Sequence, residues 1–258
     1  MFSLHNYSKI LLFSLIAFFL FPVLSMAIQL TPEQVNIGTT FNGRTITVAG
    51  EIGQDEEAVI QIIGTDTEAH FKQTGKVGGL LWMTVAHFSL AGAPSAYFVY
   101  LPETISSWHQ SKDTRWMQLK LGYDNLEDSI VIEPEQENKT GVFGDFLKLK
   151  TAHELYQMVD NGVHYKNDTN GRKVFEAEIR IPADIPRETY TVKVLKIKDG
   201  IITGQETTEL HVQLQGFPLF ISNMAYNRSL LYGIISVLIA IGAGLFMGTV
   251  FKDKGGAH

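Results

Sequence analysis

The sequence predicts a mainly β protein: an immunoglobulin-like β-sandwich with an inserted amphipathic helix, followed by a C-terminal transmembrane helix. Three observations support this class. Short alternating or β-branched segments, separated by glycine- and asparagine-containing turns, occupy residues 28–140 and 164–216. A segment between them, residues 141–163, has helical periodicity. The apolar run over residues 230–251 is long enough to cross a bilayer.

Residues 1–27 are predicted to form a signal peptide. Lys9 ends a short polar start, and the apolar run that follows, residues 10–21, is short for a membrane-spanning helix. Ser25 and Ala27 supply the small residues that a signal-peptide cleavage site requires. Cleavage after Ala27 would leave Ile28 as the mature N-terminus, and an uncleaved signal anchor is the alternative.

The N-terminal β-rich region contains four segments typical of strands. They are RTITVAGE from Arg44, AVIQII from Ala58, LLWMTVAHF from Leu80 and YFVYL from Tyr97. The continuous β-branched run AVIQII indicates a strand buried on both faces. Inward positions of adjacent strands bury large side chains, so we expect Trp82, Tyr97 and Tyr100 in the core rather than on a ligand-binding face.

The middle of the chain is less regular. Residues 115–121 are compatible with a strand or a short helix, and the acidic, polar residues 124–139 indicate a loop. The stretch DFLKLKTAHELYQMVD, residues 145–160, predicts the amphipathic helix, with Asp145 as its N-cap and Asn161-Gly162 as its end. Its apolar face would contain Phe146, Leu149, His153, Tyr156 and Val159.

Strands return in the C-terminal β-rich region. Three segments there alternate and are joined by turn residues: VFEAEIRI, TYTVKVLKI and TTELHVQL. They complete one sandwich around an inserted helix, or form a small second domain. The pattern leaves both arrangements open.

The C-terminal apolar run has a defined orientation under the positive-inside rule. Residues 217–229 form a juxtamembrane linker that contains Arg228, and the tail, residues 252–258, contains Lys252 and Lys254. Two lysines in a short tail favour a cytoplasmic C-terminus. We therefore expect a single-pass protein of the bacterial inner membrane whose N-terminal domain lies in the periplasm.

Small residues recur at every fourth position of the predicted membrane helix. Ala240, Gly244 and Gly248 share one helix face, and Gly244 and Gly248 form a GxxxG motif. Such a face lets another helix approach closely, which predicts a helix-packing site for an integral membrane protein. Glycine and alanine are also common in membrane helices, so the alternative is a helix that contacts only the lipid bilayer.

Composition and spacing favour no catalytic, metal or cofactor site. The net charge is −6 and no basic stripe is present, which argues against nucleic-acid binding. The chain contains no cysteine, no paired-histidine metal motif and no GxSxG sequence around its serines, among them Ser89, Ser95 and Ser106. The acidic stretches lack the spacing of a calcium loop and are interpreted as turns.

Four stretches together resemble a family of bacterial membrane proteins, the alpha-proteobacterial transmembrane family. They are FNGRTITVAGEI, GLLWMTVAHFSLAGAPSAYFVYLP, FEAEIRIPADIPRETYTVKVLKIKDGII and AYNRSLLYGIISVLIAIGAGLFMGTVF, in order between residues 34 and 251. The resemblance implies a signal peptide, a periplasmic domain and one C-terminal membrane helix. It also implies an accessory role beside permeases of the sulfite-exporter type.

One stretch departs from the pattern of this family. Relatives carry a basic cluster before a Trp-x-Asn motif, whereas this chain reads HFKQTGKVGGLLWMT, with Thr84 in place of the asparagine. Lys72 and Lys76 remain as the positive charges of a possible anion patch. We expect a non-catalytic accessory protein for a membrane partner such as a small-anion permease, with an autonomous periplasmic ligand-binding or sensing module as the alternative.

Overall fold

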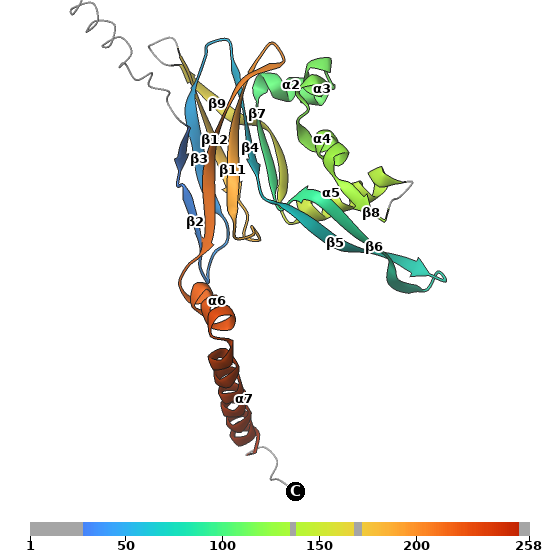
Figure 1. Ribbon diagram of the computed structural model, residues 1–258, viewed down its shortest axis with the longest axis vertical. Helices are drawn as coiled ribbons and strands as arrows, with labels where there is room; N and C mark the ends of the chain where they lie inside the picture. The colour runs from blue at the N-terminus through green and yellow to red at the C-terminus, as the bar shows by residue number, and fades with distance from the viewer. Residues whose placement is uncertain (1–27, 135–137, 168–171, 253–258) are drawn as a thin grey trace, which may run out of the picture.

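The computed structural model describes residues 28–134, 138–167 and 172–252 (Figure 1). The predicted signal peptide and residues 253–258 of the predicted tail lie outside the described residues. The strands are β1 (Gln29–Thr31), β2 (Gln34–Ile37), β3 (Arg44–Ile52), β4 (Glu57–Ile63), β5 (Asp66–Val77), β6 (Leu81–Pro94), β7 (Tyr97–Pro102), β8 (Val131–Glu133), β9 (Tyr156–Asn167), β10 (Lys173–Ile181), β11 (Thr189–Lys198) and β12 (Ile201–Leu214). The helices are α2 (Glu103–Ser111), α3 (Thr114–Leu119), α4 (Gly122–Ser129), α5 (Lys139–Ala152), α6 (Phe217–Asn227) and α7 (Ser229–Lys252).

A single sandwich contains both β-rich regions of the sequence. Nine strands are hydrogen-bonded in the order β1-β3-β10-β9-β7-β4-β11-β12-β2. The start of β9 pairs in parallel with β7 and its end pairs with β10, so β9 passes from one layer to the other. Because β3 from the N-terminal region pairs along its whole length with β10 from the C-terminal region, the two regions form one domain.

Two hydrophobic cores explain the strand patterns. The first core lies between the two layers of the sandwich and receives alternate residues such as Phe175, Ala177 and Ile179 of β10. The second core lies on the outer face of the β9-β7-β4-β11 layer, beneath the helices α2 to α5. The continuous run in β4 serves both cores, since Ile60 and Ile62 lie in the first and Val59 lies in the second. The predicted class, a mainly β sandwich with an inserted helix and a C-terminal apolar helix, is confirmed.

The inserted region differs from the sequence prediction in several places. The predicted helix over 141–163 is wrong in its second half: α5 ends at Ala152, and residues from Tyr156 onward form β9. The N-cap is Asn138, whose side chain accepts a 3.0 Å hydrogen bond from the Gly141 N–H, and not Asp145. Pairing with the distant strand β7 therefore overrides the local helical periodicity around Tyr156.

Of three further segments, one agrees with the sequence prediction and two have more regular structure than it indicates. The short-helix interpretation of residues 115–121 is confirmed by α3. The predicted loop over 124–139 is wrong, because it contains most of α4, the strand β8 and the start of α5. Most of the expected juxtamembrane linker, residues 217–229, is the helix α6.

The antiparallel pair β5–β6 extends away from the sandwich as an arm (Figure 1). The third strand of its small sheet, β8, pairs only with Ser89, Leu90 and Ala91 of β6. Beyond this point the arm is a two-stranded ribbon that ends in a turn at Gly78 and Gly79, both with positive φ. Tyr97 and Tyr100 lie in the cores as expected, but Trp82 is on this ribbon and is 69 % exposed, so its expected core position is wrong.

Candidate functional site

The membrane helix α7 presents the predicted small-residue face without any covering. The span Ser229–Phe251 is long and apolar enough to cross a membrane. Its most apolar part has a mean hydropathy of 2.4 and is 0 % buried. A side-chain atom added at Gly244 or Gly248 would meet nothing within 4 Å. Ala240, Gly244 and Gly248 therefore form an open strip along the helix.

The helix α6, which contains no charged residue, lies between the sandwich and α7 (Figure 1). It exposes Phe217, Phe220 and Tyr226, which are 63 %, 57 % and 78 % accessible. Arg187, from the loop before β11, donates a 3.0 Å hydrogen bond to Ser222 Oγ and lies 6.0 Å from the centre of the Tyr226 ring. These contacts place α6 against the β body directly above the membrane helix.

The two lysines of the possible anion patch lie on the arm, outside both cores. Both are exposed, Lys72 opposite His87 and Lys76 opposite Trp82 in the β5–β6 register. The Lys76 ammonium lies 5.4 Å from the centre of the Trp82 ring, within the range of a cation–π contact. The structure thus places Lys76 next to the exposed aromatic ring.

The base of the arm is fastened to the sandwich by Glu188, just before β11. Its carboxylate accepts hydrogen bonds from Ser95 Oγ and Thr65 Oγ1. Thr65 directly precedes β5 and Ser95 directly follows β6. From α5, Lys150 Nζ donates a 3.0 Å hydrogen bond to the Ser95 carbonyl, and burial lowers the pKa of Lys150. The hydroxyl of Tyr156 donates a 2.7 Å hydrogen bond to the Pro94 carbonyl. The arm is thus anchored at its base by groups from three other elements.

Replacing Glu188 with alanine is expected to lower the free energy of unfolding by about 1–3 kcal/mol, because the buried Ser95 hydroxyl loses its acceptor. The measurement is urea unfolding of the sandwich followed by tryptophan emission. Glu178, exposed on β10, supplies the matched control, and Glu178→Ala should change the value by less than about 0.5 kcal/mol. Equal effects of the two substitutions would contradict the anchoring role of Glu188.

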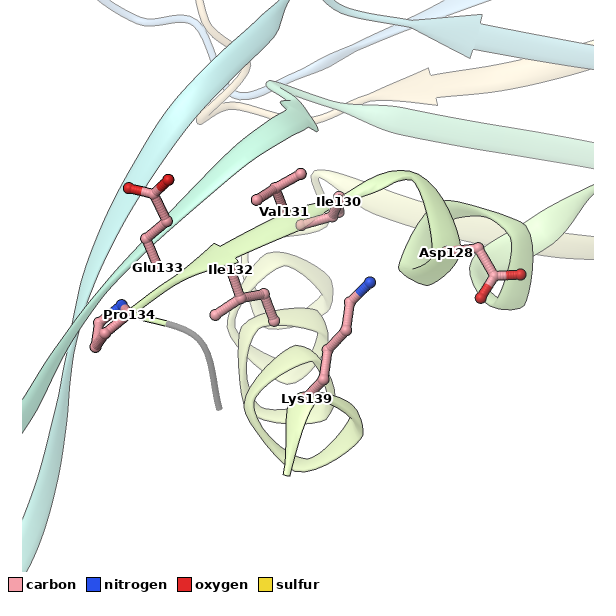
Figure 2. A pocket seen from close by; sticks show the side chains of 7 residues that line it. All are labelled: Asp128, Ile130, Val131, Ile132, Glu133, Pro134 and Lys139. Atoms are coloured by element: carbon pink, nitrogen blue, oxygen red, sulfur yellow. The ribbon is translucent and has the colours of Figure 1, made fainter. Parts of the chain in front are cut away.

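A groove runs beside β8 at the base of the arm. It has a volume of about 660 Å³ and its lining includes Ile132, Lys139 and Asp128. Figure 2 shows Ile132 and Lys139 entering it from β8 and α5, with Asp128 at the α4 side and Glu133 turned toward the arm. A second hollow of about 430 Å³, lined by His70, Lys72 and Phe88 among others, adjoins it at Glu133 and Pro134. The lining of the groove thus carries charges of both signs, Lys139 on one side and Asp128 and Glu133 on the other.

The histidines and buried serines of the described ranges can be placed by their partners. No group of three or more His, Asp or Glu side chains that could hold a metal ion occurs among the described residues. Four histidines each approach a different carboxylate: His70 with Glu68 at 4.0 Å, His109 with Asp160 at 3.2 Å, His153 with Asp184 at 3.0 Å and His211 with Glu209 at 3.8 Å. The buried hydroxyl of Ser106 donates to the Pro102 carbonyl at 2.8 Å and accepts from the Asn161 N–H, which is a structural role.

One serine has partners that the sequence did not reveal. Ser89 Oγ donates a 2.5 Å hydrogen bond to Glu68, and His70 lies 4.0 Å from the same carboxylate oxygen. The cross-strand register, which pairs Ser89 with His70, brings the three together. A nucleophilic triad places the imidazole between serine and carboxylate, whereas here the carboxylate is central. The cluster is therefore not arranged as a triad.

A mainly β body joined to one helix of membrane-spanning length and composition defines a membrane-anchored protein. The family model described as "Putative transmembrane protein (Alph_Pro_TM)" matches residues 25–253, so the chain belongs to this family and the resemblance seen in the sequence is confirmed. No curated protein and no solved structure matches the chain.

Proposed function

We propose that this protein is a non-catalytic, single-pass accessory protein that supports an integral membrane partner. The observation that carries the proposal is the uncovered α7, whose Ala240, Gly244 and Gly248 leave one face open to another helix. A small-anion permease of the sulfite-exporter type is the partner class that the family resemblance suggests.

The proposed location is the bacterial inner membrane, with the β body in the periplasm. Lys252 and Lys254 follow the membrane helix and favour the cytoplasmic side under the positive-inside rule. Tyr226 and Tyr232, at the other end, suit the opposite interface, where aromatic rings are favoured. In this orientation α7 would dock laterally on the partner, and the β body would cover part of the partner's periplasmic face.

Co-purification from the native host tests the proposal. We expect a permease to be recovered in mild detergent with the C-terminally tagged protein and to be lost from the Gly244→Ile, Gly248→Ile variant, because the added side chains separate the helices. Gly242 supplies the control. It precedes Gly244 by two residues, and therefore lies about 200° around the helix from it, on another face. Gly242→Ile should retain the partner. Loss from all variants alike, or no specific partner of the parent protein, would exclude helix docking.

The groove beside β8 favours one alternative function, an autonomous ligand-binding or sensing module with α7 as its tether. If this alternative holds, a small molecule should raise the thermal stability of the purified protein without a partner. Val131→Asp, at an exposed position of the groove lining, should abolish the gain. Sulfite and sulfate are the first probes. Unchanged stability with both, together with a recovered permease, would favour the accessory role.

A further inference from the structure

We propose that the tip of the arm inserts into the leaflet of the bilayer that faces the β body, with Lys72 and Lys76 at the level of anionic phospholipid headgroups. The arm tip is defined as residues 77–83, the turn between β5 and β6 and its flanking positions. The protein would then contact the bilayer at two places, through α6–α7 and through the arm.

The arm tip is a contiguous apolar surface. Its large side chains are all exposed: Val77 (49 %), Leu80 (88 %), Leu81 (65 %), Trp82 (69 %) and Met83 (52 %). By contrast, Phe88 and Leu90, nearer the base of β6, are 5 % and 0 % exposed. Single exposed apolar residues need no explanation, but a cluster of five at one loop marks an interaction surface.

The register of the arm puts apolar groups on both faces of its tip. Leu81 lies opposite Val77, and on the next pair Trp82 lies opposite Lys76. Successive strand residues point to opposite faces, so Leu81 and Trp82 leave the ribbon in opposite directions. A flat protein surface would cover only one face of the arm tip. The acyl chains of a bilayer would surround both faces if the tip inserted end-on.

The charge of the arm suits an anionic lipid surface. The chain as a whole has a net charge of −6, yet no Asp or Glu occurs from residue 69 to residue 102. The only formal charges in that stretch are Lys72 and Lys76, which lie just behind the apolar tip. Tryptophan prefers the membrane interface, and lysine side chains reach from it toward lipid phosphates.

The orientation of the β body directs the arm toward the bilayer. In Figure 1 the arm runs toward the end of the molecule that carries α6 and α7, and its tip lies at about the height of α6. Because a single residue separates the end of α6 from the start of α7, α6 lies next to the membrane surface when α7 spans the bilayer, and Arg187 holds α6 on the β body. With α7 across the membrane, the bilayer is the apolar medium that this fold itself places near the tip.

Trp82 supplies the probe, since the other two tryptophans, Trp108 and Trp116, are buried in the second core. The full-length protein is reconstituted singly in nanodiscs of phosphatidylcholine with phosphatidylglycerol, with or without bromine on the acyl chains. The emission of Trp82 is obtained by subtracting the emission spectrum of the Trp82→Phe variant from that of the parent protein. We expect it to be blue-shifted, quenched by the brominated chains and protected from aqueous iodide. Emission open to iodide and insensitive to bromine would overturn the proposal.

Two variants separate the apolar and the electrostatic parts of the contact. Leu80→Asp with Leu81→Asp should abolish the bromine quenching of Trp82, whereas Ile201→Asp, an equally exposed apolar position at the opposite end of β12 from α6, should leave it unchanged. Lys72→Gln with Lys76→Gln should reduce the ratio of inserted to free tip by roughly fivefold per lysine, in discs with phosphatidylglycerol only. An identical response in neutral discs would overturn the headgroup role.

Partner contacts give distinguishable results. Because the nanodisc contains one purified chain, no permease or second copy is present to shield the tip. Shielding of Trp82 that appears only in discs with two copies, or only after a permease is added, would show a protein contact and overturn the bilayer proposal. Such a result would leave the helix-docking test on Gly244 and Gly248 unaffected.

Discussion

Replacing Tyr156 with alanine is expected to lower the free energy of unfolding by about 4 kcal/mol. Deleting a buried aromatic ring costs about 3–5 kcal/mol through lost burial and the cavity left behind. Tyr156 is 0 % exposed at the start of β9, and its ring contacts Phe146 of α5 edge-on and stacks with Tyr123 of α4. A small domain is stable by about 5–15 kcal/mol, so this substitution removes a large share of the total.

The hydroxyl of Tyr156 gives the prediction an internal control. Tyr156→Phe keeps the ring and removes only the hydrogen bond to the Pro94 carbonyl, which should cost about 1 kcal/mol. Urea unfolding followed by the emission of Trp108 and Trp116 measures both variants, because these side chains lie in the same core. Equal losses for alanine and phenylalanine would contradict the packing role of the ring.

The same substitution should also loosen the arm. Pro94 ends β6, so the bond from Tyr156 reaches the base of the ribbon that carries Lys72 and Lys76. These lysines are trypsin sites on a two-stranded segment, and such segments are marginally stable alone. Under native conditions in detergent, Tyr156→Ala should therefore be cleaved faster at both lysines than the parent protein, with Glu188→Ala showing the same direction.

Local patterns predicted the strands of the sandwich and the membrane helix because their environments follow directly from residue periodicity. In β10 the inward positions Phe175, Ala177 and Ile179 alternate with charged outward positions, as a half-buried strand requires. The membrane helix α7 is predictable from its length and apolar composition alone. Neither inference needs knowledge of a distant partner.

The failures lie where distant pairing decides the structure. The segment from Tyr156 has helical spacing, but its parallel partner β7 starts at Tyr97, far away in the sequence, and pairing with it makes a strand. The expectation that Trp82 lies in the core assumes that its strand belongs to a layer of the sandwich, where inward positions bury large side chains. This end of β6 instead pairs only with β5, on the arm outside the sandwich. The contact between Ser89 and Glu68 likewise depends on the arm register, which the sequence does not specify.

Alkaline pH is expected to unfold the sandwich from about pH 10 upward, because burial raises the pKa of several tyrosines. Burial raises the pKa of Tyr123 to about 12, and burial also raises the pKa values of Tyr156, Tyr165 and Tyr190 above the usual range. An unfolded tyrosine ionises near pH 10. Above that pH the unfolded chain releases these protons while the folded chain retains them, so the free energy of unfolding falls as pH rises.

Tyr165 allows the cause to be tested at one residue. Its hydroxyl donates a 2.6 Å hydrogen bond to Glu57 and accepts one from the Ala58 N–H, and both burial and the Glu57 carboxylate raise the pKa of this phenol. Tyr165→Phe should therefore be less stable at pH 7, by about 1 kcal/mol, yet lose less of its remaining stability between pH 10 and pH 12. Tyr226, exposed on α6, is the control, and Tyr226→Phe should leave the pH profile unchanged. Phenolate absorbance that rises fully near pH 10 while the sandwich stays folded would show that these tyrosines ionise freely, and the stabilising burial inferred for them would then be wrong.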